Sequence, residues 1–230
     1  MATEVVAAGG AGPETVLFLL VPDFTLIAFA CAVEPLRIAN RMAGRELYRW
    51  RLASKDGRPV ASSTGIATAV DLSLAEAAQL APVPTVVLCS GLHGERYQDR
   101  EVIAWLRRMD RRGAEIGAIC TGAHVLARAG LLNGHRCTIH WENLPGFSED
   151  FPDIEVVQEL FEIDRRRFTS PGGTAALDLM LDRIRTRPGE ALATLVSEQC
   201  ILERIRAKSD PQLPPVRQRL KVHHAKLAHA

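Results

Sequence analysis

Short apolar runs alternate along the chain with stretches in which apolar residues recur every three to four positions. Runs of strand length, apolar throughout, predict strands that are buried on both faces of a parallel sheet. They occupy residues 15–21, 84–91 and 114–119. Alternating or shorter runs predict further strands at 48–54, at 135–140 and, as a pair with a turn near Asp164, within 154–170.

After most of these strands, apolar residues recur every three to four positions, which is the spacing of a helix. It predicts helices at 26–40, around 102–109, from Cys120 to Gly130, around 177–184 and at about 190–206. Residues 73–79 predict a short helix, because Ser73 and Glu76 have the spacing of a capping box. Residues 57–70 predict a hairpin that turns around Gly65.

The alternation of strands and helices predicts an α/β fold, a three-layer sandwich with a mostly parallel sheet and helices on both faces. Such sheets bind ligands at the carboxyl ends of their strands. Cys120, the Ser90-Gly91 loop and His140 each follow a predicted strand. We therefore expect these residues to share one edge of the sheet.

Composition and charge exclude several classes of protein. The chain has 230 residues and a net charge of +1, so global charge gives no case for nucleic-acid binding. No apolar run is long enough to span a bilayer. The five cysteines form no CxxC pair, which predicts a reduced, cytoplasmic protein without a metal or other cofactor. Among the Cys and His residues, only His223 and His224, in a polar tail, have a spacing that metal ligands could have.

The two ends of the chain differ from the middle. Residues 1–13 lack both a basic segment and an apolar core, and are predicted to be a disordered leader and not a signal peptide. Residues 14–206 are predicted to be one domain. Residues 207–230 are basic and contain three prolines, which predicts a linker and the start of a further helix.

Cys120 is the main candidate for chemistry, as a nucleophile, a ligand-sensing group or a small buried side chain. It follows an apolar strand and precedes a helix, with Ala118 and Gly122 as the small neighbours that a nucleophile elbow needs. Such a turn predicts an exposed thiol whose pKa is lowered by the helix that follows. His140 is a candidate base, hydrogen-bond partner or loop-stabilising residue. Glu34 falls on the apolar stripe formed by Ile27 and its neighbours, and is either a candidate hydrogen-bond donor to the thiolate or a surface or interface glutamate.

Several motifs agree with one known family. "AICTGAHVLARAGLLNGHRCTIHW" and "FTSPGGTAALDLMLDRI" resemble the ThiJ/PfpI superfamily, which has the class I glutamine-amidotransferase-like fold. "AVEPLRIANR", "CTGA" and "TIHWE" more narrowly resemble the amino-terminal domain of GlxA-like, AraC-family transcriptional regulators. The resemblance covers residues 15–206. It implies a flavodoxin-like sandwich, usually a homodimer, followed in such regulators by a helix-turn-helix domain that binds DNA.

The resemblance also implies a site. Cys120 matches the family's reactive cysteine, Glu34 its helix glutamate, and His140 the histidine of a Thr-x-His motif, while the Ser90-Gly91 loop matches the loop that offers amides to an oxyanion. The full set of candidate ligand-binding residues is Cys120, Thr121, His140, Glu34, Ser90, Gly91 and Trp141.

Two departures from the family pattern bear on function. Thr121 stands where PfpI-type peptidases have histidine, and Cys89-Ser90-Gly91 replaces Pro-Gly-Gly. The first departure counts against peptidase chemistry. The regulator-type motifs and the basic, linker-like tail favour a non-catalytic sensor domain, which binds a small metabolite near Cys120 and controls DNA binding through a domain beyond this chain. The alternatives are a cysteine-dependent hydratase or hydrolase related to isocyanide hydratases, and an oxidation-sensitive stress protein.

Overall fold

The centre of the fold is a seven-stranded sheet in the order β10-β11-β7-β6-β1-β2-β5, within a computed structural model that describes residues 12–213. All neighbouring strands pair in parallel except β10 and β11, which form an antiparallel hairpin at one edge. The strands are β1 (Glu14–Leu20), β2 (Tyr48–Ser54), β5 (Leu72–Ser73), β6 (Thr85–Cys89), β7 (Ile116–Ile119), β10 (Glu162–Asp164) and β11 (Arg167–Ser170).

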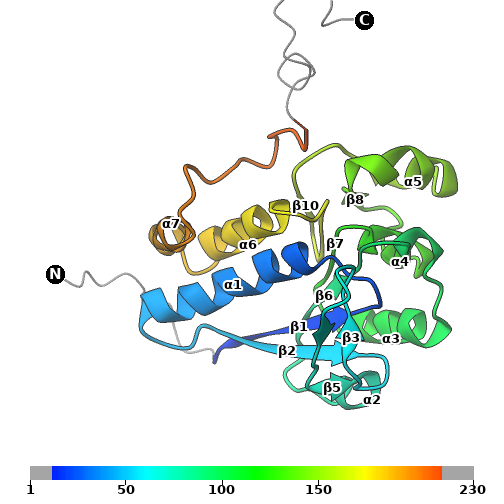
Figure 1. Cartoon of the computed structure of the whole chain (residues 1–230), viewed down its shortest axis with the longest axis horizontal. Coiled ribbons are helices and arrows are strands. Elements are labelled where there is room, and N and C mark those ends of the chain that lie inside the picture. Colours follow the sequence, from blue (N-terminus) through cyan, green and yellow to red (C-terminus); the bar gives the residue numbers. More distant parts are fainter. Residues whose placement is uncertain (1–11, 214–230) are drawn as a thin grey trace, which may run out of the picture.

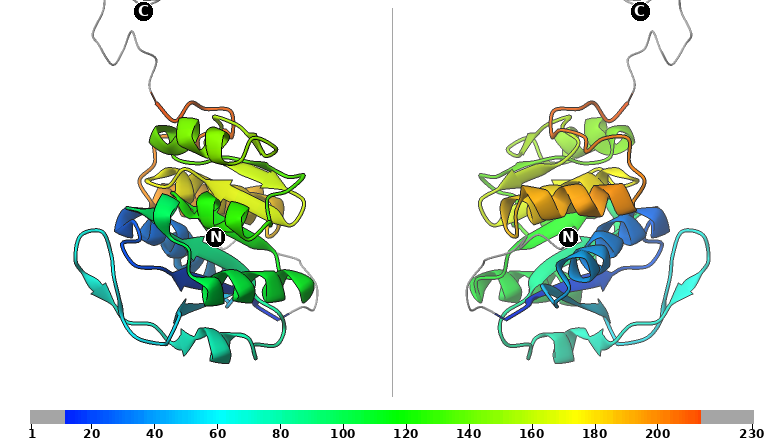
Figure 2. Two further views of the ribbon diagram at one scale, coloured as in Figure 1. Left: turned by 90° about the vertical axis from the view of Figure 1, so that its right-hand side faces the viewer. Right: turned by 90° about the vertical axis from the view of Figure 1, so that its left-hand side faces the viewer.

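Helices cover both faces of this sheet (Figures 1 and 2). One face carries α1 (Leu26–Ala43), α6 (Ala175–Thr186) and α7 (Glu190–Gln199). The other face carries α2 (Leu74–Ala77), α3 (Arg100–Arg111), α4 (Gly122–Arg128) and α5 (Leu144–Asp150). This arrangement confirms the predicted three-layer α/β sandwich.

Strand β1 is apolar throughout from Val16 to Leu20. Val16, Phe18 and Leu20 point into the core beneath α1 and α6. Leu17 and Leu19 point into the core on the opposite face. Each face of the strand is covered, so no position can be polar without a buried partner.

The small elements around the sheet include several that the sequence predicted. The hairpin consists of β3 (Val60–Ala61) and β4 (Ala67–Thr68), which pair antiparallel. The capping box at the start of α2 is present, because Ser73 and Glu76 each accept from the other's backbone amide. Two short 3₁₀ helices, η1 (Gly94–Arg96) and η2 (Trp141–Asn143), and helix α5 were not predicted.

The strand predicted at 135–140 is largely wrong. Only β8 (Arg136–Cys137) forms, and it pairs with β9 (Glu155–Val156) in a separate two-stranded sheet. The reason lies in Thr138, whose amide donates to the hydroxyl of Thr169 and whose own hydroxyl donates to a loop carbonyl. These side-chain bonds replace the backbone ladder and turn the chain away from the strand direction.

The last helix also ends earlier than predicted, at Gln199 and not near Arg206. Ile201 has a left-handed backbone with φ of 55°, and the amide of Leu202 donates back to the carbonyl of Ser197 at 3.2 Å. This is a helix-terminating geometry. The following residues cross the end of the domain as an extended segment.

Residues 1–11 and 214–230, which include most of the predicted leader, much of the predicted linker, His223 and His224, lie outside the described residues. In the described part, every helix is too short or too polar to cross a membrane. Residues 12–213 also contain no group of three His, Cys, Asp or Glu side chains that could hold a metal ion.

Candidate functional site

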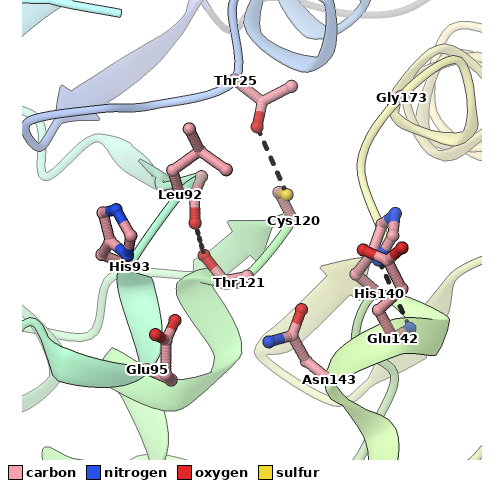
Figure 3. Close-up of a pocket in the computed structure, with 11 residues that line it drawn as sticks. Thr25, Leu92, His93, Glu95, Cys120, Thr121, His140, Glu142, Asn143 and Gly173 are labelled. Carbon is pink, nitrogen blue, oxygen red and sulfur yellow. Dashed lines mark hydrogen bonds and ion pairs between the residues drawn. The ribbon is translucent and has the colours of Figure 1, made fainter. Parts of the chain in front are cut away.

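A pocket of about 420 Å³ opens at the carboxyl ends of β6 and β7, the edge that the sequence predicted (Figure 3). Its walls come from segments that are distant in the sequence: the start of α1, the loop after β6, the β7–α4 turn, η2 and the loop before α6. It is lined by Thr25, Gly91, Leu92, His93, Glu95, Cys120, Thr121, His140, Glu142, Asn143 and Gly173.

Cys120 occupies the turn between β7 and α4 and has a left-handed backbone with φ of 60°. A non-glycine residue rarely adopts this conformation, and such strain is a feature of functional turns. Gly122 allows the turn, because a Cβ there would lie 3.0 Å from the Cβ of Ala118 and 3.1 Å from the carbonyl oxygen of Leu88. The predicted elbow is therefore confirmed in its backbone geometry.

The predicted exposure and acidity of the thiol are wrong. Cys120 is only 8% exposed. Burial raises its pKa above the ordinary value, and the hydrogen bonds from the Thr25 hydroxyl and the Thr121 amide only partly oppose this effect. The distance between Thr25 Oγ1 and Cys120 Sγ is 3.4 Å. Helix α4 has seven residues, and its amino end does not outweigh the loss of water around the sulfur.

Ser90 and Thr121 use their hydroxyls to hold the pocket wall. Thr121 donates to the carbonyl of Gly91 at 2.6 Å, and its oxygen is 3.2 Å from that of Ser90. Gly94 permits this close packing, because a Cβ there would lie 2.1 Å from the hydroxyl oxygen of Thr121 and 2.6 Å from that of Ser90. Thr121 and Gly91 line the pocket, whereas Ser90 is buried behind them.

His140 lies across the pocket from Cys120, beside Glu142 (Figure 3). Its Nδ1 accepts from the amide of Glu142 at 3.4 Å and is 3.7 Å from a carboxylate oxygen of that residue. Within residues 12–213, no hydrogen bond joins His140 to Cys120. The structure therefore brings the two predicted residues to one pocket without pairing them as base and nucleophile.

Glu34 is not at this pocket, which corrects the prediction made from the α1 stripe. Its side chain is 51% exposed and pairs with Arg37, with a distance of 2.7 Å between Oε2 and the guanidinium. Helix α1 buries the face that contains Ala28, Ala32 and Leu36, one position away from the stripe used in the prediction. Glu34 consequently points to solvent, and Thr25 is the residue of this region that contacts the thiol.

Trp141 lines a neighbouring hollow of about 200 Å³ and not the Cys120 pocket itself. The two share His140 and Gly173. The rings of His140 and Trp141 are 5.6 Å apart and tilted by 31°. His140 thus forms a common wall between the pocket and the hollow.

Sequence reasoning missed seven lining residues, among them Thr25, Glu95 and Glu142. Two of them could have been found from their positions in the sequence. Thr25 follows the first strand, and Glu142 stands two residues after His140. Glu95, His93 and Leu92 could not, because they reach the pocket only through the path of the loop after β6.

Cys89, Cys137 and His124 fit structural roles. Cys89 and Cys137 are fully buried, and burial raises the pKa of both thiols. His124 is 2% exposed, lies 5.1 Å from the ring of Phe147, and burial lowers its pKa. All five cysteines are free thiols.

Comparison with known proteins gives one consistent result. A family model described as the DJ-1/PfpI family matches residues 14–186. The chain is 45% identical over 215 residues to the HTH-type transcriptional regulator GbdR of Pseudomonas aeruginosa, covering 94% of this chain and 58% of that protein. It is 38% identical over 212 residues to the HTH-type transcriptional regulator GlxA of Rhizobium meliloti, covering 91% of this chain and 64% of GlxA.

A solved structure supports the same fold. A crystal structure of an AraC family transcriptional regulator from Pseudomonas putida has a TM-score of 0.73 and 29% identity to this chain. The match covers 82% of this chain and the whole of that one. The chain spans about three fifths of the length of the curated regulators that it matches.

Proposed function

The chain belongs to the DJ-1/PfpI family, and from that premise we propose that it is the effector-sensing part of an AraC-family transcriptional regulator. In this proposal the Cys120 pocket binds a small metabolite. Binding there controls how a helix-turn-helix domain, which is not among the described residues, engages DNA and affects transcription. The similarity to regulators over more than nine tenths of the chain supports this role.

The observation that carries the proposal is a pocket built around a thiol that has no base. Cys120 receives a side-chain hydrogen bond from Thr25, and within the described residues no histidine or carboxylate bonds to its sulfur. Burial raises the pKa of the Cys120 thiol, which favours its neutral form. Nucleophilic catalysis needs an activated thiolate, whereas binding needs only shape and polar contacts, so the geometry favours a binding site.

The charges that line the pocket favour a cationic effector. Glu95 and Glu142 contribute carboxylates, and the lining contains no lysine or arginine. A pocket lined by charges of one sign raises the local concentration of ligands that carry the opposite charge. We therefore propose an amino acid or another amine-derived compound, whose ammonium group faces these carboxylates.

A thermal-shift screen tests the proposed function. The panel pairs small amines and amino acids with neutral analogues of the same shape. We expect an amine at a hundred times its Kd to add about 2.7 kcal/mol of stability and to raise Tm by several degrees, while its neutral analogue does not. A panel without a single binder, together with turnover of a substrate, would contradict the proposal.

A second candidate, a cysteine-dependent hydratase or hydrolase, is favoured by one observation, the strained elbow at Cys120. In that mechanism the Cys120 thiolate would attack an electrophilic carbon and the pocket amides would stabilise the developing charge. Cys120→Ala should then abolish turnover and leave the fold intact. Turnover that survives this substitution, or no turnover by the wild type, rules the mechanism out.

The remaining features of the regulator are also proposals. We propose that residues 14–206 are the sensor domain and that residues 207–230 connect it to the DNA-binding part. We further propose that the protein acts as a homodimer in the cytoplasm, as the family resemblance implies. Sedimentation equilibrium of the 230-residue chain tests the dimer, and a monomer at micromolar concentration would contradict it.

A further inference from the structure

The segment after α7 is not a free tail within the described residues. Residues 201–213, which we call the C-terminal strap, leave α7 and cross the end of the sheet near β10 (orange to red in Figure 1). The amide of Leu160 donates to the carbonyl of Lys208 at 2.9 Å, so the strap is bonded to the loop that precedes β10.

The strap supplies the cations for two buried carboxylates. Asp178 of α6 is 3% exposed, and Arg206 donates to it from Nε at 3.0 Å, from a terminal nitrogen at 2.6 Å and from its backbone amide at 3.1 Å. Glu162 of β10 is 2% exposed and receives the Lys208 ammonium at 2.5 Å, with Arg136 3.7 Å away. A buried carboxylate without its cation is strongly destabilising, so the domain and the strap are energetically linked.

The strap also reaches the wall of the Cys120 pocket. The side-chain amide of Gln212 donates to the hydroxyl of Thr138 and to the carbonyl of Ile139, each at 3.1 Å. The next residue in the chain is His140, which lines the pocket. Arg206 and Gln212 line the neighbouring hollow, which shares His140 and Gly173 with the Cys120 pocket, so these two residues stand between the effector site and the strap.

We propose that the strap is the output element of the sensor, and that its docking is coupled to the filling of the Cys120 pocket through residues 138–141. An effector that orders His140 favours the position of Ile139 that Gln212 requires. A filled pocket therefore favours the docked strap, and by linkage the docked strap favours the filled pocket. This inference rests on the proposed function for the effector, and its test below needs no ligand.

The test from the strap side uses Arg206→Ala in the 230-residue chain, with hydrogen exchange and the alkylation rate of Cys120 as readouts. We expect faster amide exchange in residues 201–213 and also in 138–143, and faster alkylation of Cys120, each by about fivefold or more. Arg185→Ala is the matched control, because Arg185 pairs with Asp182 on the same helix and, among the described residues, has no hydrogen bond or ion pair to the strap. It should change none of these rates.

The test from the pocket side uses His140→Ala, which should speed exchange in residues 201–213. If Arg206→Ala fails to fold, Arg206→Gln combined with Asp178→Asn replaces the ion pair by neutral hydrogen-bonding groups. The coupling would be overturned if Arg206→Ala sped amide exchange in the strap but left exchange at 138–143 and alkylation of Cys120 at wild-type rates. It would also be overturned if neither Arg206→Ala nor His140→Ala changed amide exchange in the strap. A failed ligand screen with coupled exchange would instead contradict only the proposed function.

Discussion

At the scale of single residues, Cys120 combines a strained backbone with a protected thiol. The sulfur has a hydroxyl neighbour in Thr25 and is closed off from water by the surrounding loops. The elbow follows from local sequence, because a small residue is needed two positions to each side of the cysteine. The burial does not, since it depends on residues that arrive from α1, η2 and the loop after β6.

The raised pKa of Cys120 predicts the pH profile of its alkylation. The rate with iodoacetamide should keep rising between about pH 8 and about pH 10, because only the thiolate reacts. Thr25→Val removes a hydrogen bond that lowers the pKa of the thiol, so it should slow alkylation at pH 8 by roughly threefold. Thr194→Val, on the exposed side of α7, is the control. An alkylation rate that stays constant above pH 7 would contradict this, because it would show that the Cys120 thiol is already ionised there.

Gly172 is required by the same turn. It has φ of 90°, and a Cβ there would lie 2.8 Å from the Cβ of Cys120. Gly173 has φ of 55° with open space around it, so alanine there adds only backbone strain of about 1 kcal/mol. Urea denaturation should show that Gly172→Ala costs at least about 1 kcal/mol more than Gly173→Ala. Equal losses would mean that the contact with Cys120 is easily relieved.

At the scale of elements, the sequence predicted strands and helices whose pattern is set by burial and missed those set by side-chain bonds. Strand β1 and helix α3 have clear apolar periodicity and were found. The predicted strand at 135–140 is cut short by the hydrogen bonds of Thr138, and α7 is ended by Ile201, which carries no glycine signal. Glu34 was misplaced because α1 is apolar on more than one side, so that its buried face was ambiguous.

Asp99 at the start of α3 gives a prediction for one element. Its carboxylate accepts from the amides of Glu101 and Val102, so Asp99→Ala should cost about 1 kcal/mol in the free energy of unfolding at pH 7. Burial alone would raise the pKa of Asp99, but the Lys55 ammonium and the two amides outweigh it and lower the pKa.

The lowered pKa of Asp99 sets the pH dependence of this stabilisation. The carboxylate stabilises the fold fully above its unfolded pKa of about 3.9, and the effect is lost as pH falls through the lower folded value. Asp99→Asn, which can still cap the helix, should therefore be less stable than wild type at pH 7 and should approach it below about pH 4. If the loss of stability in Asp99→Asn is the same at low pH as at pH 7, the negative charge of Asp99 does not stabilise the fold.

At the scale of the whole molecule, the end of the sheet opposite the pocket is held by a network of charges. Arg183 of α6 reaches Glu14 at 3.2 Å and Glu115 at 2.9 Å, and its guanidinium lies 4.4 Å from the centre of the Phe168 ring. Arg187 binds the same two carboxylates from a more exposed position. The network joins β1, the start of β7 and α6.

The two arginines of this network should differ in their effect on stability. Arg183 is 7% exposed, and Arg187 still pairs with both carboxylates when Arg183 is lost, so Arg183→Met should cost about 2 kcal/mol in the free energy of unfolding through its lost buried hydrogen bonds. Arg187 is 38% exposed, so Arg187→Met should cost about 1 kcal/mol or less. Urea denaturation of both variants measures the difference. Equal losses of unfolding free energy in the two variants would show that the burial of Arg183 adds no stability.

The family and the sandwich could be predicted from the sequence because motif order and apolar periodicity determine them. The composition of the pocket could be predicted only in part. The places of Cys120, Thr121, Gly91 and His140 after predicted strands put them at this edge, whereas Glu95 and Glu142 come from the short 3₁₀ helices η1 and η2, which were not predicted. That the two carboxylates share one pocket is visible only in the folded molecule.

The most direct test of the proposed effector site is titration calorimetry with the amine that gives the largest shift in the screen. Glu142→Gln removes a carboxylate that lines the pocket, and Glu34→Gln removes one that lies outside it. We expect Glu142→Gln to weaken binding by about fivefold or more and Glu34→Gln to leave the Kd unchanged. Equal weakening by both variants, or no change with Glu142→Gln, would contradict the assignment of the Cys120 pocket as the effector site.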